Sequence, residues 1–190
     1  MFSHKKFAAA TSVEFCGLAL EPSPAGKVII SPSPNRLAAL LDFLSPTSKK
    51  EVKSLVGLLN TFAKHIPNVN SLTTKMRELT RDRSAFLWTE EHEEEMESIR
   101  AAASKYLPLG PFNIANASQI YADASHLGLG YTFTQIDADG QEYFVQCGST
   151  SCSESMKNYT CMELELQAIL WALKNVPYTC WHLTSLYLYK

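Results

Sequence analysis

Alternation of apolar and polar residues is clearest in the second half of the chain, where it predicts a small sheet, a helix and one further strand. Three alternating runs follow the Pro- and Gly-containing linker YLPLGPFN: QIYADA at 119–124, LGYTFTQ at 129–135 and EYFVQC at 142–147. Asp139-Gly140, between the last two runs, is a typical hairpin signal. An amphipathic run at 160–175 then predicts a helix, and 182–190 predicts a strand, giving the order β-β-β-α-β.

The first half of the chain shows the spacing of amphipathic helices instead. Ser48 stands three residues before Glu51, as in a capping box. The apolar residues that follow fall on one helical face: Val52, Leu55, Val56, Leu59 and Phe62. Further helices are predicted for NRLAALLDFL, SLTTKMRELTRD and WTEEHEEEMESIRAAASKYL, the last with Thr89 as its cap. Upstream, SVEFCGLALEPSPAGKVIISPSP predicts two short extended pieces around a turn at 22–26.

These patterns predict an α+β fold in three parts. Residues 1–33 form a short β segment, residues 34–106 a helical region, and residues 107–190 a mixed β-sheet with one helix. The hydrophobic content of 46% suffices for a core, and the net charge of −2 gives no strong electrostatic signal for nucleic acid.

The composition also bears on compartment. Five scattered cysteines lack the paired spacing of a zinc site, which favours reduced thiols in an intracellular protein, cytoplasmic or nuclear. No apolar run reaches the roughly 20 residues that a bilayer span needs, so we expect no membrane partner.

Asp123 is the first candidate for chemistry, because it ends an apolar strand just before a Ser-His-Leu-Gly turn. One interpretation is a turn-initiating Asp, which is common where strands end. The other is a functional carboxylate. In the strand Asp123 would share a face with Gln119 and Tyr121, and Ile120, Ala122 and Ala124 would share the opposite face.

Glu165 on the following helix is the second candidate. Its neighbours at helical spacing are apolar or small, whereas those of Glu163 are mixed, so Glu165 is predicted to point inward and Glu163 toward solvent. An inward Glu is costly unless it is paired or binds a metal ion. Asp123 and Glu165 could therefore meet and hold a divalent cation such as magnesium.

The motifs around both residues resemble a known family. YADASHLGLGYTFTQ, followed by NYTCMELELQAILWALKN, is similar to the ribonuclease H-like domain of gypsy-type LTR retrotransposon Pol proteins, which reads D-A-S-x-x-G-x-G and later N-Y-x-x-x-E-x-E-L-x-A-I. Upstream, LLDFLSPTSKKEVKSLVGLLNTFAKHIPN resembles the thumb and connection of the reverse transcriptase in the same proteins.

This resemblance implies a helical thumb/connection region followed by a partial ribonuclease H fold, from a Pol protein truncated at both ends. The family cleaves the RNA strand of an RNA–DNA hybrid with two Mg²⁺ ions, and Mn²⁺ is an alternative metal. The hybrid, or another nucleic acid, is the partner it implies. Carried over, Asp123 and Glu165 are the catalytic, metal-binding residues.

The chain also departs from the family pattern. The family's third acid lies in a T-D-H motif on the next strand, but no Asp follows Asp139 and no Glu follows Glu165. The arginine of the family's G-S-R-S loop is Thr150, and the adjacent Asp pair of the polymerase is absent. Three hypotheses follow: an active hybrid-cleaving nuclease with a degenerate site, a catalytically inactive remnant that binds nucleic acid or protein, and a fragment of a decayed element without function.

Overall fold

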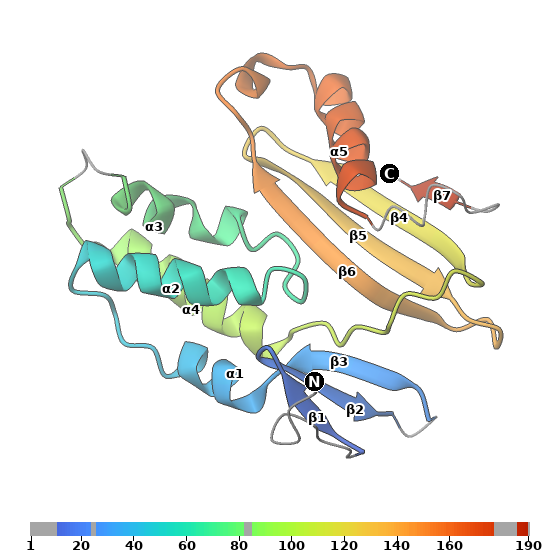
Figure 1. Cartoon of the computed structure of the whole chain (residues 1–190). Coiled ribbons are helices and arrows are strands. Elements are labelled where there is room, and N and C mark those ends of the chain that lie inside the picture. Colours follow the sequence, from blue (N-terminus) through green and yellow to red (C-terminus); the bar gives the residue numbers. More distant parts are fainter. Residues whose placement is uncertain (1–10, 24–25, 82–84, 177–185, 190) are drawn as a thin grey trace, which may run out of the picture.

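The computed structural model describes residues 11–23, 26–81, 85–176 and 186–189. Its elements form two sheets and a group of helices, with a small sheet and the helices packed beside a larger sheet that carries one helix on its far face (Figure 1). The α+β class predicted from the sequence is confirmed. Division into domains at residues 33/34 and 106/107 stays a prediction.

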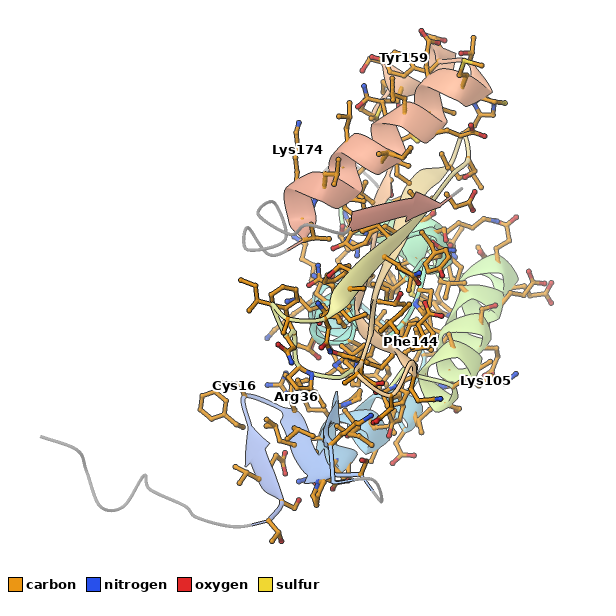
Figure 2. All side chains as sticks on the ribbon, turned by 90° about the vertical axis from the view of Figure 1, so that its right-hand side faces the viewer. Cys16, Arg36, Lys105, Phe144, Tyr159 and Lys174 are labelled. Carbon is orange, nitrogen blue, oxygen red and sulfur yellow. The ribbon has the colours of Figure 1, made fainter. Side chains whose placement is uncertain are left out.

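The small sheet is antiparallel, in the order β1-β2-β3. Its strands are β1 (Val13–Phe15), β2 (Leu18–Pro22) and β3 (Val28–Pro32). The single extended piece predicted before the turn at 22–26 is two strands, because the chain turns at Cys16 and Gly17, whose φ angles are 53° and 79°. Two observations explain the glycine at position 17. Its φ is in the left-handed region, and a Cβ atom there would lie 2.0 Å from Nε of Arg36. Figure 2 shows Cys16 and Arg36 together at this end of the sheet.

Four α-helices follow: α1 (Pro34–Leu41), α2 (Lys49–Thr61), α3 (Thr74–Leu79), preceded by a 3₁₀ turn at Ser71–Thr73, and α4 (Glu90–Ser104). The Ser48 cap of α2 is confirmed, since Ser48 Oγ accepts a hydrogen bond from the backbone N–H of Glu51 at 3.3 Å. In place of the return bond of a capping box, the Glu51 carboxylate accepts from the N–H of Thr47 at 2.7 Å. Thr89 caps α4, and His92 takes the place of an acid in its capping box. The helix predicted for residues 35–44 ends earlier, at Leu41.

The helices enclose the larger of the hydrophobic cores. It holds Val52, Leu55, Leu59 and Phe62 of the predicted α2 face, all at most 1% exposed, together with residues of α1, α3 and α4 such as Leu40, Met76 and Met96. Val56 packs against this cluster while partly exposed. The heptad-like apolar spacing therefore identified the buried face of α2.

His65 joins the end of this core to the linker. Its backbone carbonyl accepts from the N–H of Leu107 at 2.8 Å, and its Nδ1 donates to the carbonyl of Leu107 at 3.0 Å. The side chain is 2% exposed, and this burial lowers its pKa from the ordinary value, more than the bond to Leu107 raises it.

Stability should therefore fall as the pH drops below the unfolded-state pKa of His65. Between the lowered folded pKa and about 6.5, only the unfolded chain binds the proton, so the free energy of unfolding loses at most about 1.4 kcal/mol per pH unit from this residue. Urea unfolding at pH 7.5 and 5.5 measures the loss. His65→Asn keeps a donor near Nδ1 but does not titrate, so its loss should be smaller; an equal loss in both proteins would contradict this account.

The larger sheet has the order β6-β5-β4-β7. Its elements are β4 (Ala117–Ala124), β5 (Gly128–Ile136), β6 (Glu142–Ser151), α5 (Cys161–Asn175) and β7 (Leu186–Tyr189). β4, β5 and β6 are antiparallel, and β7 pairs with β4 in parallel, which confirms the predicted β-β-β-α-β order. β6 extends beyond the predicted run at 142–147, because residues 148–151 pair with residues 128–131 of β5.

α5 covers one face of this sheet. Leu164, Ala168 and Ala172 form its buried stripe and pack on Ala122, Leu129 and Ile120. Figure 2 shows Tyr159 just before the start of α5 and Lys174 near its end, both far from the small sheet. Thr160 begins the helix with a capping box: its Oγ1 accepts from the N–H of Glu163 at 3.4 Å, and its own N–H donates to Glu163 at 2.8 Å. Glu163 is exposed, as predicted.

Among the helices the structure describes, none is long and apolar enough to cross a membrane. The cysteines within the described ranges, Cys16, Cys147, Cys152 and Cys161, are free thiols. Cys180 lies outside those ranges.

Candidate active site

Asp123 lies near the end of β4, on the face of the sheet opposite α5. The residue before it, Ala122, packs against Leu164 and Ala168 of α5. Because neighbouring residues of a strand face opposite ways, the side chain of Asp123 is on the other face, as is its partner in register, Gly130 of β5. The carboxylate is exposed. The predicted separation of Asp123 from Ala122 and Ala124 on the two faces is therefore confirmed.

A small polar pocket of about 70 Å³ surrounds Asp123. It is lined by residues from the two central strands, the turn between them, the end of β6 and the loop after α2: Asn68, Ser71, Asp123, Ser125, Gly128, Leu129, Gly130, Ser149 and Thr150. Apart from Asp123, its polar side chains are amides and hydroxyls. The sequence interpretation did not include Asn68 or Ser149 in this site.

The loop after α2 reaches this pocket because Gly130 has no side chain. A Cβ atom on Gly130 would lie 2.5 Å from Oδ1 of Asn68, too close for any real contact. Asn68 itself adopts a left-handed φ of 55°, which Asn tolerates better than most residues. Both glycines beside Asp123 pack closely, Gly130 against this loop and Gly128 against the backbone of Thr150.

Asn70 fastens the same loop to β6. Its backbone N–H donates to Ser149 Oγ at 3.0 Å, and its side-chain amide donates to the carbonyl of Ser149. Arg77 of α3 donates to Oδ1 of Asn70 at 2.7 Å and to Oγ1 of Thr73 at 2.8 Å. These bonds hold the helical region against the Asp123 face of the sheet.

Glu165 lies on α5, over the opposite face of the sheet. It is half-buried beside the stripe that begins with Leu164, so it is less enclosed than its helical neighbours suggested. Two of those neighbours, Cys161 and Met162, are exposed. Glu165 is not among the residues that line the Asp123 pocket. Joint coordination of a metal ion by Asp123 and Glu165 stays a prediction.

The donor atoms around Asp123 are oxygens, which suit a hard cation, but only one of the side chains carries a negative charge. Carboxylate, amide and hydroxyl oxygens are the ligands that Mg²⁺ accepts, usually with several waters. Within the described part of the chain, no group of three or more His, Cys, Asp or Glu residues is placed to hold a metal ion. The oxygen donors therefore suit a divalent cation, and they include fewer carboxylates than the two-ion cluster that the family resemblance implies would need.

Comparison of the chain with known proteins identifies a family. The profile of the RNase H-like domain found in reverse transcriptase matches residues 88–184. The chain is 25% identical over 145 residues to the Transposon Tf2-3 and Tf2-4 polyproteins of Schizosaccharomyces pombe, a match that covers 76% of this chain. It spans 11% of the length of those polyproteins.

Solved structures share the fold over most of the chain. The foamy viral protease-reverse transcriptase in complex with RNA/DNA hybrid matches with a TM-score of 0.74 and 19% identity, over 86% of this chain and 22% of the viral one. Its complex with dsDNA matches with a TM-score of 0.72 and 20% identity, over 87% and 33%. RNase H-like domains generally use divalent metal ions, in keeping with the oxygen donors beside Asp123. The chain belongs to the family of RNase H-like domains found in reverse transcriptase.

Proposed function

We propose that this chain binds RNA–DNA hybrid and that its cleavage of the RNA strand is impaired. The observation that carries the proposal is the donor set around Asp123, in which a single carboxylate is accompanied by amide and hydroxyl oxygens. The foamy viral structure with the same fold was solved with an RNA/DNA hybrid bound, which supports the choice of ligand. We also propose that the chain acts inside the cell, in the cytoplasm or nucleus.

In this proposal Asp123 and Glu165 bind Mg²⁺, or Mn²⁺ in its place. When bound, the metal would supply activated water and charge stabilisation at the leaving oxygen. Asp123 offers its exposed carboxylate from the end of β4, and the close packing of Asn68 on Gly130 shapes the pocket around it. Even with Glu165 as a second ligand beside Asp123, two carboxylates would neutralise the family's two divalent cations incompletely, so we expect hydrolysis to be slow or absent while binding persists.

The helical region carries exposed lysine side chains, the kind of residue that contacts the phosphate backbone of nucleic acids. Lys50 and Lys53 are exposed on α2, and their spacing of three places them on one helical face. Lysines that contact phosphates release counterions on binding, so affinity should depend on salt. We propose that Lys50 and Lys53 contact the phosphate backbone.

Fluorescence anisotropy of a labelled hybrid in Ca²⁺, across a salt series, tests the binding. The double variant Lys50→Gln/Lys53→Gln should weaken binding and reduce the slope of log K against log salt by about 1.8, or about 0.9 per lost contact. Lys105→Gln removes an exposed lysine just after α4 and should leave the slope unchanged. Absence of hybrid binding by the folded wild-type chain would contradict the proposal.

A further inference from the structure

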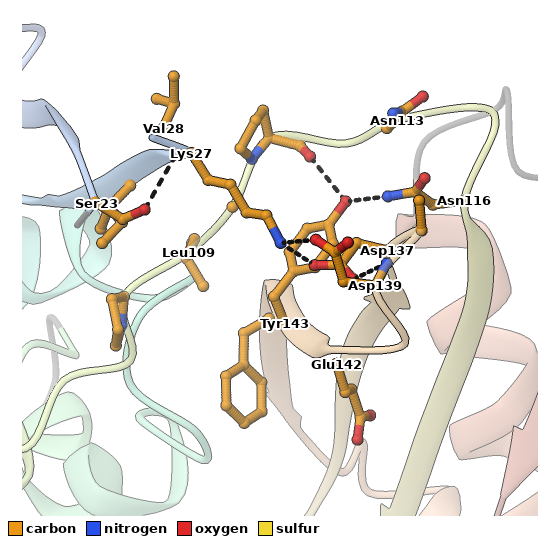
Figure 3. A pocket seen from close by; sticks show the side chains of 16 residues that line it. Ser23, Lys27, Val28, Leu109, Asn113, Asn116, Asp137, Asp139, Glu142 and Tyr143 are labelled. Carbon is orange, nitrogen blue, oxygen red and sulfur yellow. Dashed lines mark hydrogen bonds and ion pairs between the residues drawn. The ribbon is translucent and has the colours of Figure 1, made fainter. Parts of the chain in front are cut away.

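A second, larger pocket lies between the two sheets, away from Asp123. Its volume is about 610 Å³, within the range of small-molecule sites. Three segments enclose it: the β2–β3 hairpin, the linker between α4 and β4, and the β5–β6 hairpin (Figure 3). Val28, Leu109 and Phe144 supply apolar wall, and Val28 and Phe144 are 45% and 38% exposed.

The linker makes the back of this pocket rigid by bonding to both sheets. Leu109 exchanges two backbone hydrogen bonds with Ile30 of β3, at 2.7 and 2.9 Å, and the N–H of Gly110 donates to the carbonyl of Phe144 at 2.7 Å. Gly110 leaves room for the ring of Tyr143, whose Cδ2 would lie 2.4 Å from a Cβ atom. The Tyr143 hydroxyl accepts from Asn116 Nδ2 at 3.0 Å. The walls are therefore preformed.

A lysine side chain already spans the pocket between the two hairpins. Lys27 extends from the β2–β3 hairpin to the β5–β6 hairpin, where its ammonium pairs with Asp137 and, at 3.3 Å, with Oδ2 of Asp139 (Figure 3). Asp137 is held in place because its Oδ1 accepts from the backbone N–H groups of Asp139 and Gln141, both at 2.9 Å. The Asp139 side chain is 76% exposed.

We propose that this pocket binds a small amphipathic organic cation, which displaces the ammonium of Lys27 from Asp137 and Asp139. The apolar body of the ligand packs on Val28, Leu109 and Phe144, and its amine or guanidinium replaces Lys27 at the two carboxylates. Lys27 itself shows the complementarity, because an aliphatic chain ending in an ammonium crosses this space.

The charge of the lining selects the sign of the ligand. Besides Lys27 the pocket contains the carboxylates of Asp137, Asp139 and Glu142, so its net charge is negative. An anion, including a nucleic-acid phosphate, would meet repulsion from these groups. The negative charge of the pocket therefore distinguishes it from a surface that binds a hybrid. The pocket lies between the small sheet and the larger one.

Ligand-observed NMR with three matched probes tests the proposal on the full chain. The probes are 4-phenylbutylamine, 4-phenylbutan-1-ol and 4-phenylbutanoate, which share a body and differ in charge. We expect the amine to bind more tightly than the alcohol by about two- to fivefold, the range of a solvent-exposed ion pair, and the carboxylate to bind most weakly.

Variants then place the binding in this pocket. Lys27→Met removes the competing ammonium and should tighten amine binding by about two- to fivefold, whereas Asp139→Asn should weaken it by a similar factor. Glu154→Gln neutralises an exposed acid near the start of α5, outside the pocket, and should change nothing. No binding of the amine, equal binding of amine and carboxylate, or an unchanged affinity in Lys27→Met would overturn the proposal.

Discussion

Replacing Phe133 with alanine is expected to lower the free energy of unfolding by about 3–5 kcal/mol, the usual cost of deleting a fully buried aromatic ring. Phe133 on β5 is 0% exposed and packs in the cluster with Ile120, Ala172 and Val176. Its ring centroid lies 6.1 Å from that of Phe112 in the linker. The cavity would open between the sheet and α5. Urea unfolding followed by circular dichroism measures the loss.

Phe144→Ala is the matched control for this variant. Phe144 is on the adjacent strand and 38% exposed, so removing its ring leaves no enclosed cavity. The free energy of unfolding should therefore fall by about 1 kcal/mol or less. Similar losses in the two variants would show that α5 does not seal the face of the sheet that carries Phe133. That result would contradict the packing described for the larger sheet.

Gly148→Ala is expected to destabilise the protein by about 1–3 kcal/mol through overpacking. A Cβ atom on Gly148 would lie 2.6 Å from Cε1 of Tyr131, on the face that α5 covers. Tyr131 cannot yield easily, because its hydroxyl accepts from Gln146 Nε2 at 2.9 Å and its ring meets Trp171 edge-on, with centroids 5.2 Å apart. Thermal unfolding by calorimetry would register the change as a lower melting temperature.

Gly57→Ala is the same substitution at a position where we expect it to raise stability. Gly57 is exposed within α2, and a Cβ atom there would meet nothing within 4 Å. Alanine at this position should raise stability by about 0.5–1 kcal/mol, because it has the higher helix propensity. The two glycine variants should therefore move in opposite directions. If Gly148→Ala had no effect, the close approach of Tyr131 to β6 would be wrong. If Gly57→Ala lowered stability, the open space beside Gly57 would be wrong.

Much of the fold could be predicted because local signals agreed with tertiary packing. The runs at 119–124 and 129–135 are bounded by turn or linker residues. α2 and α5 combine a side-chain cap with an apolar stripe, so these elements could be identified. The turn at Cys16 was missed because a cysteine with positive φ gives no sequence signal. The end of β6 was missed because G-S-T-S is polar, and only pairing with β5 makes those residues a strand.

The site was only partly predictable for a related reason. The period of a strand fixed the face on which Asp123 lies, and the motif drew attention to it. Its neighbours Asn68 and Ser149 come from segments 55 residues before and 26 after it, brought together by the bonds of Asn70 and by the absence of a side chain on Gly130. Such a contact depends on how the helical region docks, which no local pattern encodes. Glu165 was predicted to point inward, but it lies at the edge of the α5 stripe, since Leu164 occupies the inward position.

The most direct test of the account is hydrolysis of a 5′-labelled RNA–DNA hybrid by the purified chain, with Mg²⁺ or Mn²⁺, under conditions where anisotropy shows the hybrid to be bound. Asp123→Asn serves as the control, because it removes the carboxylate and nearly preserves the side-chain volume. We predict a bound hybrid whose RNA is cut slowly or not at all, with any metal-dependent cutting abolished by Asp123→Asn. Rapid, metal-dependent cutting by the wild-type chain that persists in Asp123→Asn would contradict both the impaired site and the place assigned to it.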